Sequence, residues 1–131
     1  MANVLVDSSV WIDYLNGQFK PQTSLLTAAL DRDEVITGDL VLMEIVQGMR
    51  TDMQVRGVLD LFAPVPCYTL GGREMAISAS QNYRLLRKRG VTVRKSIDVL
   101  IATWCIENDV ALLHADRDFD VMETLGLKVV G

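Results

Sequence analysis

The 131-residue chain is predicted to fold as one α/β domain, with helices on both faces of a central parallel sheet of about five strands. Three observations predict this three-layer class. Short apolar runs alternate with segments of helical periodicity along the whole chain. The run 4–6 is apolar on both faces, as in the interior of a parallel sheet. Hydrophobic residues make up 50% of the chain, enough for one substantial core.

Five strands are expected where short apolar runs are bounded by turn residues. They span residues 4–6, 34–37, 65–68, 111–114 and 128–130. Pro64 and Pro66 bracket the third run. Because proline removes a donor from the hydrogen-bond ladder of a sheet, this strand is expected to be short.

Seven helices are expected between these strands, from apolar residues at helical spacing. They span residues 10–15, 24–31, 40–46, 52–62, 73–89, 97–108 and 119–125. Most of them follow a side chain that can cap a helix: Thr23 or Ser24, Asp39, Thr51 or Asp52, Ser96 and Asp118. Gly71 and Gly72 open the long fifth helix, and Gly90 ends it.

The net charge is −4 and the isoelectric point about 4.9, which argues against a general nucleic-acid binder. The charge is unevenly distributed, however, because residues 75–97 contain no Asp or Glu. The same stretch carries six basic residues: Arg84, Arg87, Lys88, Arg89, Arg94 and Lys95. Such a patch can bind a polyanion locally, or it can be a solvated helix end that complements the helix dipole.

A cytoplasmic protein without a membrane span is expected. No apolar run approaches the length that a membrane-spanning helix needs. The N-terminus enters a strand directly, without the basic and apolar regions of a signal peptide. Cys67 and Cys105 have no metal-like spacing and are expected to be reduced, buried thiols.

Two isolated acids stand out in the first half of the chain. Asp7 ends the first strand, and the carboxyl ends of parallel strands are where such sheets bind ligands. Helix capping is the alternative role for Asp7. Glu44 is the only polar residue between Leu40 and Val46. Since a lone buried carboxylate is costly, Glu44 is expected to be a ligand or half of a structural ion pair.

Two further acids occupy equivalent places in the second half. Asp98 lies in the first turn of an apolar, hence buried, helix whose N-terminus favours an anion. Stabilisation of the helix dipole is the alternative role for it. Asp116 follows the strand 111–114, and Asp118 comes two residues later. We expect Asp116 to be a ligand and Asp118 to cap the next helix or to support the ligands.

Four carboxylates from separate elements would repel one another if the fold gathered them, and a hard divalent cation removes that repulsion. Mg²⁺ prefers oxygen ligands and often acts on phosphates. His114 is the only histidine, so no zinc set is available, and it is expected to be structural. The chain also lacks a phosphate-binding glycine loop and a serine or cysteine nucleophile motif. A Mg²⁺ site of the four acids is therefore predicted.

The acids lie in segments that resemble those of PIN-domain ribonucleases, and more closely those of VapC-like toxins from type II toxin–antitoxin pairs. The segments are VLVDSSVWIDYL (4–15), LMEIVQG (42–48), RKSIDVLIA (94–102) and LLHADRDF (112–119). The resemblance implies a five-stranded parallel sheet and an endoribonuclease that depends on Mg²⁺ or Mn²⁺. By motif position it implies Asp7, Glu44, Asp98 and Asp116 as catalytic and metal-binding acids, with Ser9 near the metal. It also implies a homodimer that a small antitoxin inhibits.

On this interpretation the metal activates a water for in-line attack on RNA, and basic side chains hold the RNA backbone: Arg84, Arg87, Lys88, Arg94 and Lys95. Helical apolar residues are candidates for an antitoxin groove, unless they simply cover the sheet: Trp11, Leu15, Val55, Leu59 and Phe62. The rival interpretation is a Mg²⁺-binding module without catalysis, either receiver-like or PIN-like. A receiver normally has paired acids after its first strand, whereas Asp7 stands alone there.

Overall fold

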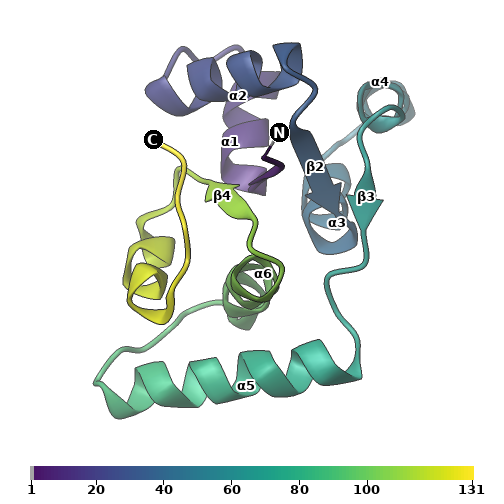
Figure 1. The fold of residues 1–131 in the computed structure, drawn as a ribbon. Coiled ribbons are helices and arrows are strands. Elements are labelled where there is room, and N and C mark those ends of the chain that lie inside the picture. The colour runs from purple at the N-terminus through teal and green to yellow at the C-terminus, as the bar shows by residue number, and fades with distance from the viewer. Residues whose placement is uncertain (1) are drawn as a thin grey trace.

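A parallel four-stranded sheet forms the centre of the computed structural model, which describes residues 2–131 (Figure 1). Its strands are β1 (Val4–Val6), β2 (Val35–Gly38), β3 (Cys67–Tyr68) and β4 (Ala111–Leu113). They lie in the order β3-β2-β1-β4, so β1 pairs with both β2 and β4. Every pairing is parallel, which confirms the predicted α/β class.

The sheet has four strands rather than the predicted five. Residues 128–130 approach β4 only at an isolated bridge between Leu112 and Val129. Leu112 donates its N–H to the carbonyl of Lys128 and accepts from the N–H of Val130, and these two bonds are too few for a strand. β3 is also as short as its flanking prolines predict, although the Pro66 carbonyl still accepts a 2.8 Å bond from the Thr37 N–H.

Helices cover both faces of the sheet. In chain order they are α1 (Ser8–Leu15), α2 (Pro21–Asp31), α3 (Asp39–Gln47), α4 (Asp52–Phe62), α5 (Arg73–Lys88), α6 (Ser96–Glu107) and the 3₁₀ segment η1 (Arg117–Leu125). Figure 1 shows α5 and α6 together on one side of the sheet, with α1 and α2 on the other. The three-layer arrangement is therefore confirmed.

Several helices begin earlier than the candidate caps predict. α2 begins at Pro21, because proline is pre-shaped for the first helical position, and Thr23 instead accepts from the Lys20 N–H. Asp39 and Ser96 are each the first helical residue rather than the cap. At α4 the prediction is confirmed, since the Thr51 side chain accepts from the Gln54 N–H.

Two of the residues proposed for a partner surface are instead buried in the core. Trp11 is fully buried and Phe62 is nearly so, and their ring centroids lie 4.4 Å apart. Both side chains therefore join α1 to α4 inside the molecule. Cys105 is buried as expected, but Cys67 is exposed because β3 lies at the edge of the sheet. Within residues 2–131, every helix is too short or too polar to cross a lipid bilayer.

Candidate metal centre

Asp7 stands at the carboxyl end of β1, and its carboxylate serves two neighbours. One oxygen, Oδ2, accepts a 2.6 Å bond from the Ser9 hydroxyl and a 3.1 Å bond from the Ser9 N–H, which caps α1. The Ser9 hydroxyl in turn accepts from the Ala115 N–H at 3.1 Å. Ser9 thus ties the end of β1 to the segment after β4, and it holds the 4%-exposed Asp7 in a fixed orientation.

Asp98 projects from the first turn of α6 and is only 2% exposed. Its Oδ2 is buried and has no hydrogen-bond partner within the described chain. Burial, followed by the negative field of Asp7, raises the pKa of Asp98 to about 7, and Lys95 opposes that rise. Asp116 and Glu44 raise this pKa further. The negative charges of three other acids therefore all raise the pKa of Asp98.

Glu44 reaches the same region from α3. Its Oε1 is buried without a hydrogen-bond partner among the described residues, and no cation lies within ion-pair distance of it there. Burial, then the charge of Asp7, raises the pKa of Glu44, while Lys95 and Ser8 lower it. The geometry of Glu44 therefore does not favour the alternative of a structural ion pair.

Asp116 and Asp118 complete the acidic cluster from the segment after β4. Each offers a carboxylate oxygen within 4.8 Å of one from Asp98 and of one another. Asp116 caps η1 by accepting from the Asp118 N–H at 2.9 Å. The alternative that Asp118 caps this helix is wrong, because the 3₁₀ segment begins at Arg117, two residues before the expected start. The other role expected for Asp118, support of the ligands, stays a prediction.

Two basic side chains pair with this cluster. They join the loop before α6 to the segment after β4, two segments that are distant in the sequence. Arg94 donates a 2.8 Å bond to Asp118 Oδ2, and Lys95 Nζ lies 3.8 Å from Asp116 Oδ2. The other predicted RNA-binding residues lie apart from the acids, exposed on α5: Arg84, Arg87 and Lys88.

The donor set suits a hard divalent cation. Three carboxylates approach one another closely, and Asp98 and Glu44 each keep a buried oxygen without a partner. Like charges at such distances resist joint ionisation unless a cation lies between them. The available donors are oxygens, as Mg²⁺ or Mn²⁺ requires. His114 accepts from the Asp116 N–H through Nδ1 at 3.3 Å and packs on Phe119, which fits the structural role expected for it.

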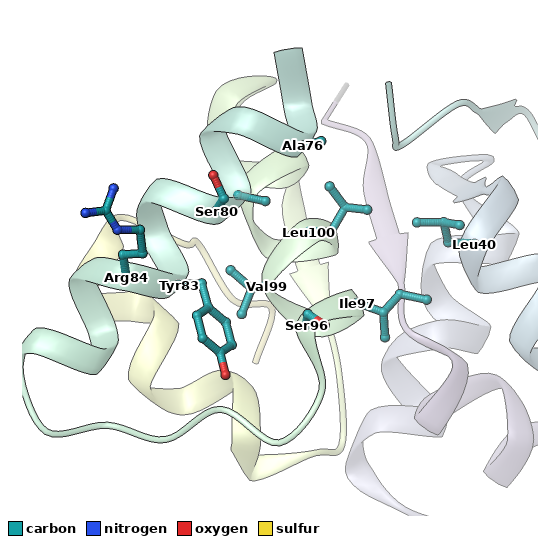
Figure 2. Close-up of a pocket in the computed structure, with 10 residues that line it drawn as sticks. Leu40, Ala76, Ser80, Tyr83, Arg84, Ser96, Ile97, Val99 and Leu100 are labelled. Atoms are coloured by element: carbon teal, nitrogen blue, oxygen red, sulfur yellow. The ribbon is translucent and has the colours of Figure 1, made fainter. Parts of the chain in front are cut away.

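A separate groove of about 610 Å³ lies between α5 and α6. Figure 2 shows Leu40 and Ile97 at one end of it and Tyr83 and Arg84 at the other. None of the acids discussed above lines it. It is therefore a different surface feature from the acidic cluster, although Ser96 and Ile97 place it beside the N-terminus of α6.

Comparisons with known proteins agree with this architecture. The family model of the PIN domain matches residues 4–125. Two relatives are 26% identical over 121 residues, 91% of this chain and 90% of theirs: VapC ribonuclease Mb1587 of Mycobacterium bovis and ribonuclease VapC11 of Mycobacterium tuberculosis.

Solved structures share the fold at lower sequence identity. The VapBC2 structure from Rickettsia felis, bound to a promoter DNA fragment, matches with a TM-score of 0.76 at 14% identity. VapBC-1 from nontypeable Haemophilus influenzae matches with a TM-score of 0.75 at 15% identity. Each match covers 97% of this chain and 96% of the matched one.

Proposed function

This chain belongs to the PIN domain family, and from that premise we propose that it is a Mg²⁺-dependent endoribonuclease, the toxin of a type II toxin–antitoxin pair. Its similarity to proteins named VapC ribonucleases supports this activity. We take residues 1–131 as one such domain. One observation carries the proposal: Asp98 is buried among other carboxylates with an oxygen that lacks a partner within the described chain.

Asp7, Glu44, Asp98 and Asp116 would hold the metal, and their oxygen ligands suit Mn²⁺ as well as Mg²⁺. When bound, the metal supplies an activated water and neutralises charge on the scissile phosphate. The chain's own residues prepare the site for it. Both hydrogen bonds to Asp7 go to Oδ2, so Oδ1 is available to a ligand. The N-terminus of α6 favours the ionised form of Asp98.

Contacts to RNA are proposed for the basic residues of α5 and of the loop that follows it. Arg84, Arg87 and Lys88 are exposed on α5, and Arg94 and Lys95 lie on the loop that leads into α6. Exposed cations can hold the phosphate backbone of RNA, and this contact is independent of base sequence. Neutralising the three α5 residues together should weaken RNA binding and flatten its salt dependence, without changing metal affinity.

The direct test of the activity is cleavage of total cellular RNA by the purified protein, freed of any partner, with Mg²⁺ or with EDTA. We expect cleavage only with Mg²⁺, and none by Asp98→Asn. The exposed Asp60 on α4 provides the matched control, and Asp60→Asn should cleave like the wild type. Metal binding without cleavage of any RNA would instead favour a non-catalytic PIN-like module, and phosphorylation by a small phosphodonor would favour a receiver.

A small antitoxin protein is the proposed partner, and exposed apolar side chains near α1 and α4 support a docking surface for it. Ile12 is 41% exposed on α1, Leu59 is 46% exposed on α4, and Met53 is 75% exposed at the start of α4. A groove of about 380 Å³ lies between the ends of α1 and α3 and the helix α4. An apolar helix of the antitoxin would suit this surface.

The partner test is co-purification from the native host, followed by a cleavage assay. We expect one small protein to co-purify and to block cleavage, and we expect the toxin alone to be harmful when overproduced. If no small protein co-purifies and the overproduced chain is harmless, the toxin assignment fails even where cleavage is observed.

We also propose that the chain forms a homodimer through the layer of α5 and α6, on the opposite face of the sheet. Ile77 and Leu85 are exposed on α5, beside the apolar groove between α5 and α6. Light scattering of the purified chain should give twice the mass of the 14.6 kDa protomer. A monomer at all concentrations would contradict this part of the proposal.

A further inference from the structure

Lys95 and Arg94 occupy an unfavourable place in the chain by ordinary helix rules. Lys95 is the N-cap residue of α6, and its side chain makes no capping hydrogen bond. Helices prefer Ser, Thr, Asp or Asn at this position, because those side chains accept from the first free N–H groups. A cation there also opposes the helix dipole. We therefore expect another interaction to offset the unfavourable free energy of two adjacent cations at the start of this helix.

The offsetting interaction is with the acidic cluster. Lys95 Nζ lies 3.8 Å from Asp116 Oδ2, and Arg94 lies 2.8 Å from Asp118 Oδ2. Both basic side chains are more than half exposed, 53% for Lys95 and 75% for Arg94, so solvent is open to them when they leave the acids.

A divalent cation bound to Asp116 would repel an ammonium group that lies 3.8 Å from an oxygen of the same carboxylate. We propose that Lys95, with Arg94 beside it, is a built-in counter-ion of the metal centre, which a divalent cation displaces and which then faces the RNA phosphates. This inference rests on the proposed function and adds a regulation to it. Metal binding and the exposure of two RNA-binding cations become one linked event.

The test compares Lys95→Gln with the wild type in calorimetric titrations with Mn²⁺ and in thermal unfolding with EDTA. An exposed ion pair stabilises by a modest amount, so we expect Mn²⁺ to bind Lys95→Gln about two- to five-fold more tightly. Without metal, the variant should unfold at a lower temperature, because the acids have lost their counter-ion. Adding Mn²⁺ should then raise its melting temperature more than that of the wild type.

Two control variants separate pairing from general charge. Lys95→Arg keeps the cation and should behave like the wild type in both measurements. Arg56 is exposed in the interior of α4 and forms no ion pair with a carboxylate among residues 2–131, so Arg56→Gln should change neither Mn²⁺ affinity nor metal-free melting temperature.

The outcomes distinguish this inference from the proposed function. If the wild type binds Mn²⁺, Asp98→Asn does not, and Lys95→Gln behaves like the wild type, the counter-ion role is overturned and the metal centre stands. An equal gain of Mn²⁺ affinity in Arg56→Gln also overturns it, since the effect would then be one of net charge. A wild type that binds no Mn²⁺ overturns both.

Discussion

Asp98→Asn should stabilise the metal-free protein at neutral and alkaline pH, although the same change abolishes the proposed activity. The reason is the buried position of Asp98 among other acids, which raises its pKa from 3.8 to about 7. A raised pKa in the folded state means that the folded protein holds a proton that the unfolded chain has released. The stability that comes from the protonated acid is therefore full below pH 3.8 and is lost as the pH rises through about 7.

The size of this effect follows from the shift in pKa. A difference of about 3 pH units corresponds to ~4 kcal/mol between the fully protonated and fully ionised limits. Integrating proton release between pH 5 and pH 8 gives a loss of about 2–3 kcal/mol in the free energy of unfolding. That loss is a large fraction of the total stability of an ordinary domain, which is about 5–15 kcal/mol.

The assay is urea unfolding in EDTA at several pH values between 5 and 8, for the wild type, Asp98→Asn and the exposed control Asp60→Asn. The difference between wild type and Asp98→Asn cancels the titrating groups that do not interact with Asp98. We expect this difference to grow with pH in favour of Asp98→Asn, and Asp60→Asn to follow the wild type. Equal pH dependence in wild type and Asp98→Asn would refute the reasoning, since Asp98 would then ionise without cost.

Three further predictions follow from individual contacts. Ser9→Ala removes the hydroxyl that joins Asp7 to Ala115, so it should lower the free energy of unfolding by about 1–3 kcal/mol and weaken Mn²⁺ binding. Urea unfolding measures the first effect and calorimetric titration the second, and an unchanged Mn²⁺ affinity would show that Ser9 is not part of the metal site. Asp116→Asn should weaken Mg²⁺ binding more than Asp118→Asn, while η1 remains capped because Asn also caps well, and the reverse order in metal titrations would exchange their roles. Leu59→Asp should abolish antitoxin capture in a pull-down but leave RNA cleavage intact, whereas Leu85→Asp, on the other layer, should still capture it; capture by Leu59→Asp would place the partner elsewhere.

The parts of the fold that local sequence determines were predictable. The apolar run 4–6 predicted the central strand β1, and Asp7 stands at its carboxyl end as expected. The apolar surroundings of Asp98 predicted its burial. The same reasoning failed where two local rules competed: Thr23 resembles a helix cap, but Pro21, two residues earlier, begins α2.

Features that depend on distant segments could not be predicted from the sequence. The bond between Ser9 and Ala115 joins residues 106 positions apart, and the pair of Arg94 with Asp118 spans 24 positions. Residues 128–130 carry the apolar pattern of a strand, but the pairing with β4 reaches only one bridge. The sequence left open whether Trp11 covers the core or faces a partner, and the contact with Phe62 of the distant helix α4 places it in the core.

The most direct test of the metal centre is anomalous scattering from crystals of the protein soaked in Mn²⁺. We predict a Mn²⁺ peak bound by Asp7, Glu44, Asp98 and Asp116, with the ammonium group of Lys95 moved away from Asp116. Crystals of Asp98→Asn, treated identically, should lack that peak. A Mn²⁺ ion bound only elsewhere on the protein would contradict the assignment of this cluster as the centre that cuts RNA, whereas Lys95 still paired with Asp116 at saturating Mn²⁺ would contradict only its counter-ion role.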